Sequence, residues 1–182
     1  AAAHAGVAIH RGDAAGYRSA CRDELSLAER GGAERTAAWA RLKLADAALM
    51  AGDLDESIAL GRIAVATLSQ LDQPSNLGLA LTNLCAARIL RGQDAPAREA
   101  AAQALPLMWR NGWGYLLLDA LALLAVRAGF AVQAATLLGH ADAWYARHGD
   151  VRQPNEAPLA ALCVSPWAGT LSPPEPARCR AA

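Results

Sequence analysis

The chain has 182 residues, and its 17 basic and 17 acidic residues give a formal net charge of zero. This balance leaves no electrostatic footprint for nucleic acid or for an anionic membrane surface. Hydrophobic residues make up 54% of the chain. Much of that share is alanine, which favours helices and lets them approach closely. Because runs of alternating β-branched residues are absent, the composition predicts an all-α protein.

Targeting and redox signals point to the cytoplasm. The longest apolar stretch, residues 115–126, is shorter than the roughly 20 residues needed to cross a bilayer, and no secretory signal is visible. The chain does not begin with Met, so we expect it to be a fragment of a longer protein. The cysteines form no CxxC pair, which argues against a zinc site or a disulfide scaffold and predicts a reducing compartment. They are Cys21, Cys85, Cys163 and Cys179.

Four short turns that contain glycine divide the chain at spacings of 40, 40 and 37 residues, and each separates two apolar helical stretches. In chain order the predicted helices cover about residues 1–11, 14–29, 34–51, 54–71, 76–91, 95–110, 113–128 and 131–148. Paired as four hairpins, they predict a right-handed α-α superhelix, a solenoid in which each repeat packs on its neighbours. The turn glycines are Gly12, Gly52, Gly92 and Gly129.

Small residues recur at fixed distances from these glycines, which predicts where the two helices of a hairpin cross. Seven positions before each glycine lie Ala5, Ala45, Cys85 and Ala122, and five positions after it lie Tyr17, Ser57, Ala97 and Ala134. Tyr17 is the exception in size. Eight positions before the last three glycines, large side chains should face the neighbouring repeat; these are Leu44, Leu84 and Leu121.

This pattern resembles the tetratricopeptide repeat, which has small residues at the two crossing points and Gly-Asp or Gly-Asn in the turn. The period of 40 is longer than the usual 34 or so. Residues 134–143, followed by Gly149 and Pro154-Asn155-Glu156, are similar to the end of the helical-repeat arm in bacterial STAND-type ATPase regulators. That resemblance implies a P-loop module and a winged-helix or LuxR-type DNA-binding domain elsewhere in a longer protein. We expect helical repeats over 1–149, a capping segment over 150–163, and a Pro-rich, disordered tail over 164–182.

Catalytic and metal sites are not predicted. The sequence contains no GxxxxGK[ST], GxGxxG, GxSxG or HExxH motif, and no cofactor is expected. His140 and His148 share a helix face with a separation of about 12 Å, too far apart to bind one ion, and Asp142 lies on another face. These residues are therefore interpreted as exposed helix positions.

The inner surface of such a solenoid is lined by the first helix of each hairpin, at positions 13, 10, 6 and 3 before the turn glycine. A mostly apolar groove with polar points at Asp46, Thr82 and Asp119 would suit a peptide or an amphipathic helix. Alternatively, the two aspartates are solvated charges on an exposed face. Arg127, at the rim, is either a partner for an acidic ligand or an ordinary exposed arginine. The predicted groove residues are Trp39, Leu42, Asp46, Leu49, Leu79, Thr82, Ala86, Ile89, Leu116, Asp119, Leu123 and Val126.

Aromatic residues gather in the third and fourth repeats, in a chain that has few of them. They either fill gaps between helices or line a ligand or partner site. The cluster contains Trp109, Trp113, Tyr115, Trp144 and Tyr145.

These patterns favour a non-catalytic interaction module, the sensor arm of a bacterial transcriptional regulator that binds a protein, a peptide or a small effector. The module itself is not expected to bind nucleic acid or membranes. The alternative is a standalone adaptor or a homo-oligomerising scaffold that uses the apolar end of its last repeat. A small all-α enzyme would need titratable residues clustered in a pocket, and the sequence pattern places none there.

Overall fold

The structure is a computed structural model that describes residues 13–164, and within this range the chain folds into α-helices without a β-strand. Consecutive helices pack against each other, which confirms the predicted all-α arrangement of helical repeats. The predicted helix over 1–11 and nearly all of the predicted tail lie outside the described residues. The helices are α2 (Ala14–Arg30), α3 (Glu34–Met50), α4 (Leu54–Gln70), α5 (Pro74–Leu90), α6 (Asp94–Arg110), α7 (Tyr115–Arg127), α8 (Ala131–His148) and α9 (Ala157–Val164).

Helices α2 to α6 are each 17 residues long and are joined by three-residue links, so the structure repeats every 20 residues. The helix ends explain this regularity. After α3, Gly52 adopts a φ of 76°, and the Asp53 amide donates to the Ala48 carbonyl at 2.9 Å. This is a Schellman turn, which requires a left-handed residue that glycine supplies at little cost. The same left-handed position is filled by Gly32, Gly52, Asp72, Gly92, Gly112, Gly129 and Gly149.

Two predicted boundaries are wrong. The turn before α5 was expected at residues 73–75, but α5 begins at Pro74, because proline fits the first helical position, where no backbone donor is needed. The turn residue is instead Asp72, with a φ of 48°. Helix α7 begins at Tyr115 rather than at residue 113 and has only 13 residues, which accounts for the shorter last spacing.

We expect Asp72→Gly to raise the free energy of unfolding by about 0.5–1 kcal/mol. A left-handed conformation costs an L-residue about 1–2 kcal/mol, and this gain is partly offset by the greater freedom of glycine in the unfolded chain. The matched control is Gly52→Ala, which should lower stability by about 1 kcal/mol through conformation alone, because an added Cβ there meets no atom within 4 Å. Urea unfolding of both variants checks the pair, and an Asp72→Gly protein no more stable than the parent would contradict it.

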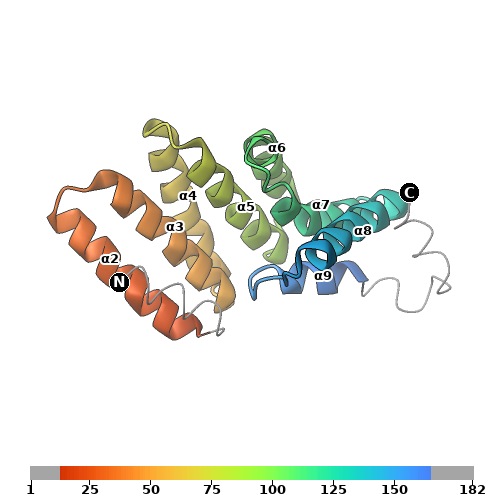
Figure 1. Ribbon diagram of the computed structural model, residues 1–182, viewed down its shortest axis with the longest axis horizontal. Helices are drawn as coiled ribbons and strands as arrows, with labels where there is room; N and C mark the ends of the chain where they lie inside the picture. Colours follow the sequence, from red (N-terminus) through yellow and green to blue (C-terminus); the bar gives the residue numbers. More distant parts are fainter. Residues whose placement is uncertain (1–12, 165–182) are drawn as a thin grey trace.

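The helices stack side by side from α2 at one end to α7 and α8 at the other (Figure 1). Helices α3, α5 and α7 are neighbours and form the inner layer. The predicted crossing point is confirmed in the α3–α4 hairpin, where the Ser57 hydroxyl donates to the Ala45 carbonyl at 2.9 Å. The expected contacts with neighbouring repeats are found as well, since Leu44 packs with Tyr17 of α2 and Leu84 lies against Gly61 of α4.

The chain reverses after α8 at Gly149, which has a φ of 64°. The following segment, residues 150–156, reaches the inner layer, and α9 then packs on α7 (Figure 1). None of the described helices is both long and apolar enough to cross a lipid bilayer. The returning segment is what completes the site described next.

Candidate functional site

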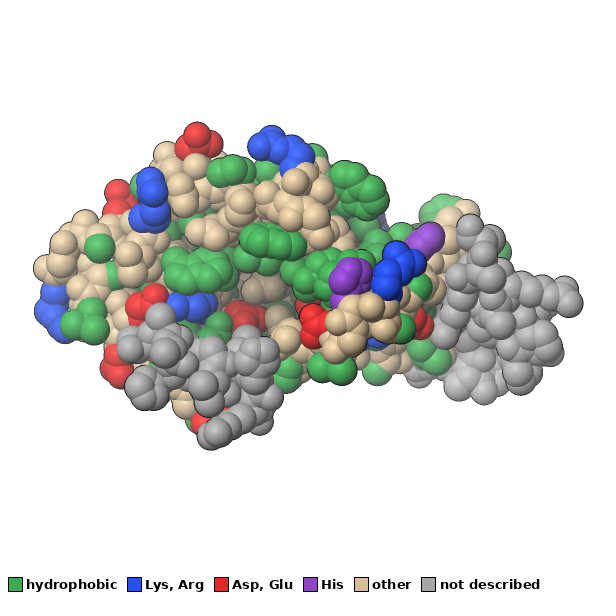
Figure 2. Space-filling view, in the orientation of Figure 1, with side chains coloured by type: hydrophobic (Ala, Val, Ile, Leu, Met, Phe, Trp, Pro, Cys, Tyr) green, Lys and Arg blue, Asp and Glu red, His purple; other side chains and the backbone are tan. Residues whose placement is uncertain are grey.

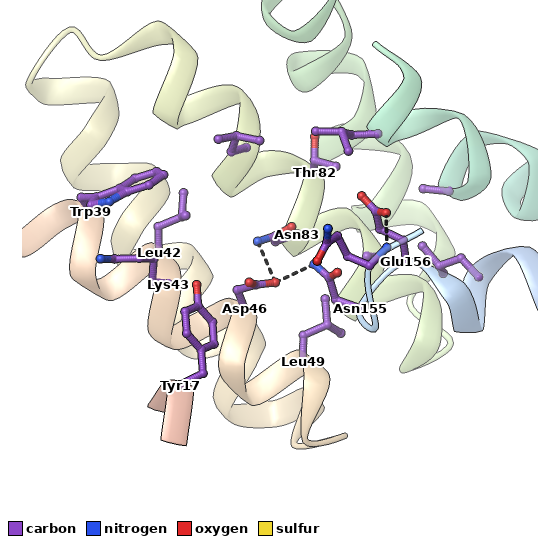
Figure 3. A pocket seen from close by; sticks show the side chains of 16 residues that line it. Tyr17, Trp39, Leu42, Lys43, Asp46, Leu49, Thr82, Asn83, Asn155 and Glu156 are labelled. Carbon is purple, nitrogen blue, oxygen red and sulfur yellow. Dashed lines mark hydrogen bonds between the residues drawn. The ribbon is translucent and has the colours of Figure 1, made fainter. Parts of the chain in front are cut away.

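A pocket of about 240 Å³ lies where α3, α5 and the returning segment meet (Figure 3). In the space-filling view, acidic side chains are visible in the hollow near the middle of this face, below a band of hydrophobic side chains (Figure 2). The lining comes from elements that are far apart in the sequence. It comprises Tyr17 of α2; Trp39, Leu42, Lys43, Asp46 and Leu49 of α3; Leu79, Thr82, Asn83 and Ala86 of α5; Leu116 and Ala120 of α7; Gln153, Asn155 and Glu156 of the segment; and Leu159 of α9.

The α3 residues of the lining follow helical spacing, so they project from one face of that helix. The same spacing on α5 aims its residues into the pocket from the opposite side. The structure therefore brings together eight of the twelve positions predicted for the groove. They are Trp39, Leu42, Asp46, Leu49, Leu79, Thr82, Ala86 and Leu116.

Asp46 lies in the pocket wall and is only 6% exposed. Its Oδ1 atom accepts a hydrogen bond from the Asn155 amide at 2.6 Å and a longer one from the Asn83 amide at 3.4 Å (Figure 3). Burial raises the pKa of the Asp46 carboxyl to about 7; hydrogen bonding from Asn155 and Tyr17 offsets only part of that effect, and the nearby charge of Glu156 adds to it. The alternative interpretation of Asp46 as a solvated surface charge is thus wrong.

A second carboxylate in the same pocket belongs to Glu156. Its Oε2 atom accepts hydrogen bonds from the Gln153 backbone amide at 2.8 Å and from the Tyr145 hydroxyl at 2.9 Å. Burial raises the pKa of Glu156 above its usual range. Sequence reasoning used Asn155 and Glu156 only as part of a resemblance. The available signal was the group of polar residues at 152, 153, 155 and 156, shortly after the helix stop at Gly149.

Lys43 supplies a positive charge to the lining, but this charge already has a partner. Its ammonium group forms an ion pair with Glu24 of α2 and lies 5.7 Å from the centre of the Trp39 ring. Together with Asp46 and Glu156, it makes a cluster of titratable groups in a pocket, which the sequence pattern did not reveal. The cluster forms only when α2, α3 and the returning segment are folded together.

Asp119 does not lie in the groove lining, contrary to prediction. It is 3% exposed, and both of its carboxylate oxygens accept hydrogen bonds from the Arg152 guanidinium, at 2.6 and 2.9 Å. It is therefore not a solvated charge either. The reason is that the returning segment carries Arg152 onto α7, where Ala120 takes the lining position.

Arg127 is not free to meet an acidic ligand. Its Nη1 atom donates to the Ile89 carbonyl at 2.8 Å and to Asp94 at 2.5 Å, so it ties α7 to α5 and α6. The other predicted groove positions are also taken up by packing. Ile89 and Leu123 are buried in the core, and Val126 packs against it.

None of the predicted aromatic cluster lines this pocket, although the Tyr145 hydroxyl bonds to Glu156 of its wall. Trp144 stacks on Tyr115 with ring centroids 3.4 Å apart and on His148 at 4.2 Å, so it fills the space between helices. Trp109 is 74% exposed, and Trp113 is about half as exposed. Trp109 and Trp144 also line a separate, more open hollow of about 530 Å³ together with His140 and Arg147. The cluster thus combines packing with an exposed surface.

Within residues 13–164, no three His, Cys, Asp or Glu side chains are grouped closely enough to hold a metal ion. Comparisons of the chain with models of protein families, with curated proteins and with solved structures found no match. The relationship to STAND-type regulators therefore stays a prediction from residues 134–156, and a proposal about function depends on the geometry of the pocket.

Proposed function

We propose that this protein is a non-catalytic helical-repeat module that binds a small effector in the pocket between α3, α5 and residues 153–156. The observation that carries this proposal is the hydrogen bond from Asn155 to Asp46, which joins residues 109 positions apart at the pocket wall. A ligand seated there touches the early repeats and the returning segment at once. The segment also forms part of the pocket wall, and the volume of about 240 Å³ favours a small molecule over the peptide or amphipathic helix that the sequence suggests.

A ligand at this position could alter the shape of the whole solenoid. Each repeat packs on its neighbours, so a small change between α3, α5 and the returning segment shifts the relative positions of the two ends. As the sensor arm of a bacterial transcriptional regulator in the cytoplasm, the module would pass that change to an attached ATPase or DNA-binding domain. This part of the proposal is supported by the resemblance of residues 134–156.

A binding role is favoured over catalysis because two polar side chains of the pocket, Lys43 and Thr82, are already bonded to groups outside its lining. Lys43 is paired with Glu24, and the Thr82 hydroxyl donates to the Gly78 carbonyl at 2.9 Å.

Trp39 offers a direct test, because its ring lines the pocket whereas Trp109 lies outside it. We expect members of a library of small polar-apolar fragments to shift the indole N–H resonance of Trp39 in an NMR titration while that of Trp109 stays in place. Trp39→Phe and Trp109→Phe assign the two signals by their loss. The proposal fails if no fragment moves the Trp39 signal, or if fragments move all indole signals alike.

A further inference from the structure

The pocket contains strong hydrogen-bond acceptors. Asp46 and Glu156 contribute carboxylates, and the Oδ1 atom of Asn155 is a buried acceptor with no hydrogen-bond partner. The orientation of the Asn155 amide is fixed, because its Nδ2 atom donates to Asp46 at 2.6 Å. The reverse orientation would place the amide oxygen against the Asp46 carboxylate. An unsatisfied buried polar group destabilises the folded chain. The carboxylates of Asp46 and Glu156 have further lone pairs, so a ligand that donates hydrogen bonds is favoured in this pocket.

The charges of the pocket also favour a ligand that donates hydrogen bonds. Lys43 is the one cationic side chain among the described lining residues, and Glu24 neutralises it. Arg152 lies outside the lining. Its charge lowers the pKa of Glu156, but its guanidinium is bonded to Asp119 and Asp142. The carboxylates of Asp46 and Glu156 thus share the pocket without a cation of their own, and a positively charged ligand balances them.

Much of the rest of the wall is apolar, which favours a ligand with an apolar body. Trp39 provides an aromatic face, and the volume of about 240 Å³ suits one ring or a short alkyl chain. The aliphatic part of the wall consists of Leu42, Leu49, Leu79, Leu116 and Leu159.

We propose that the ligand is a small organic cation, a protonated primary amine on an apolar body, whose ammonium group donates hydrogen bonds to the carboxylates of Asp46 and Glu156. This inference rests on the proposed function and names its ligand class. An ammonium group carries three donors, enough to bond both carboxylates, and hydrogen bonds between charged groups are about twice as strong as neutral ones. The leucine side chains then cover the apolar body.

Binding of such a cation is linked to protons. The pKa of Asp46 is raised to about 7 by burial, so at lower pH the ammonium group must displace a proton from this carboxyl group. We expect the affinity to fall about tenfold or more between pH 8 and pH 5.5, since each pH unit below the pKa reduces the carboxylate fraction about tenfold. The side chains around Asp46 are Tyr17 and Cys21 of α2, Lys43 of α3, the neutral Thr82 and Asn83 of α5, and the neutral Asn155 with Glu156 of the returning segment.

The experiment compares probes that share a body and differ in charge. Phenethylamine and hexylamine are titrated into the protein at pH 8 by calorimetry and by the Trp39 indole resonance, beside phenethyl alcohol and 3-phenylpropionate. We expect the amines to bind at least tenfold more tightly than the alcohol and the acid. Asp46→Asn should weaken amine binding about tenfold or more. The matched control, Asp55→Asn, makes the same change at an exposed carboxylate outside the pocket and should leave binding unchanged.

Other outcomes of this experiment contradict either the cation assignment or the proposed function. If the alcohol or the acid binds as well as the amines, or if Asp46→Asn leaves amine binding unaltered, the cation assignment is overturned while a small-molecule pocket stands. If no probe binds at millimolar concentration and no library fragment moves the Trp39 resonance, the proposed function itself fails. Loss of folding cannot explain a loss of binding in Asp46→Asn, because this variant is expected to be more stable than the parent at pH 8.

Discussion

Asp46→Asn is expected to raise the free energy of unfolding at pH 8 by about 2–4 kcal/mol. In the folded chain the pKa of Asp46 is raised from 3.8 to about 7 by burial, so ionisation of this group at higher pH opposes folding. A shift of about three pKa units corresponds to about 4 kcal/mol at most. Asparagine has nearly the same shape, and its oxygen accepts the amide hydrogen bonds of Asn83 and Asn155 without the cost of a buried charge.

The size of this effect depends on pH. Between pH 4 and pH 7 the folded chain holds a proton on Asp46 that the unfolded chain has released, so the contribution of Asp46 to stability falls as pH rises through this window. The advantage of Asp46→Asn is therefore small at pH 4, grows up to about pH 7 and is constant above it. Urea unfolding at pH 4, 6 and 8 measures the difference. An advantage that does not change with pH would show that charge burial is not its cause.

Arg152→Ala is expected to lower the free energy of unfolding by about 3–5 kcal/mol. Its guanidinium binds both oxygens of Asp119, a side chain that is almost fully buried. Removing one partner of a buried ion pair leaves an uncompensated charge, which is far more costly than the loss of a surface pair. The substitution also removes the contact between Arg152 and the ring of Tyr145, 5.0 Å from the guanidinium.

The matched control uses the other carboxylate of the same arginine. Asp142 is 2.8 Å from the Arg152 Nη2 atom, but its side chain is 39% exposed. Asp142→Asn should therefore cost less than about 1 kcal/mol. Urea unfolding at pH 7 compares the two variants, and equal losses would contradict the assignment of the Arg152 effect to the buried charge of Asp119.

These predictions assign different roles to Asp46 and Asp119, two buried aspartates that occupy similar positions in the repeat. Each lies on the first helix of a hairpin, at a position expected to face the groove. Asp119 is neutralised by an arginine, so its contribution is structural. Asp46 receives only amide and hydroxyl hydrogen bonds and keeps a raised pKa in a pocket. Strongly perturbed carboxyl groups in clefts are typical of functional sites, which is why Asp46 is the centre of both proposals.

The sequence by itself determined the helices and their stacking. Glycine at the left-handed turn position, small residues at the crossing points and apolar helices between them are local signals, so the repeat was visible without long-range information. Errors arose where another residue takes the place of glycine, as at Asp72, and where proline begins a helix, as at Pro74. Helical spacing also predicted which face of α3 and α5 turns inward, and Asp46 with it.

Only the tertiary structure decided what surrounds that face. Residues 150–156 carry no periodic pattern, and their path is set by contacts with side chains 33 to 109 positions away. This path delivers Arg152 to Asp119 and Asn155 to Asp46, so it converts one predicted groove aspartate into a buried ion pair and the other into part of a pocket. Local propensity contains no information about such contacts, because their energy comes from desolvation and from partners that meet only in the folded chain.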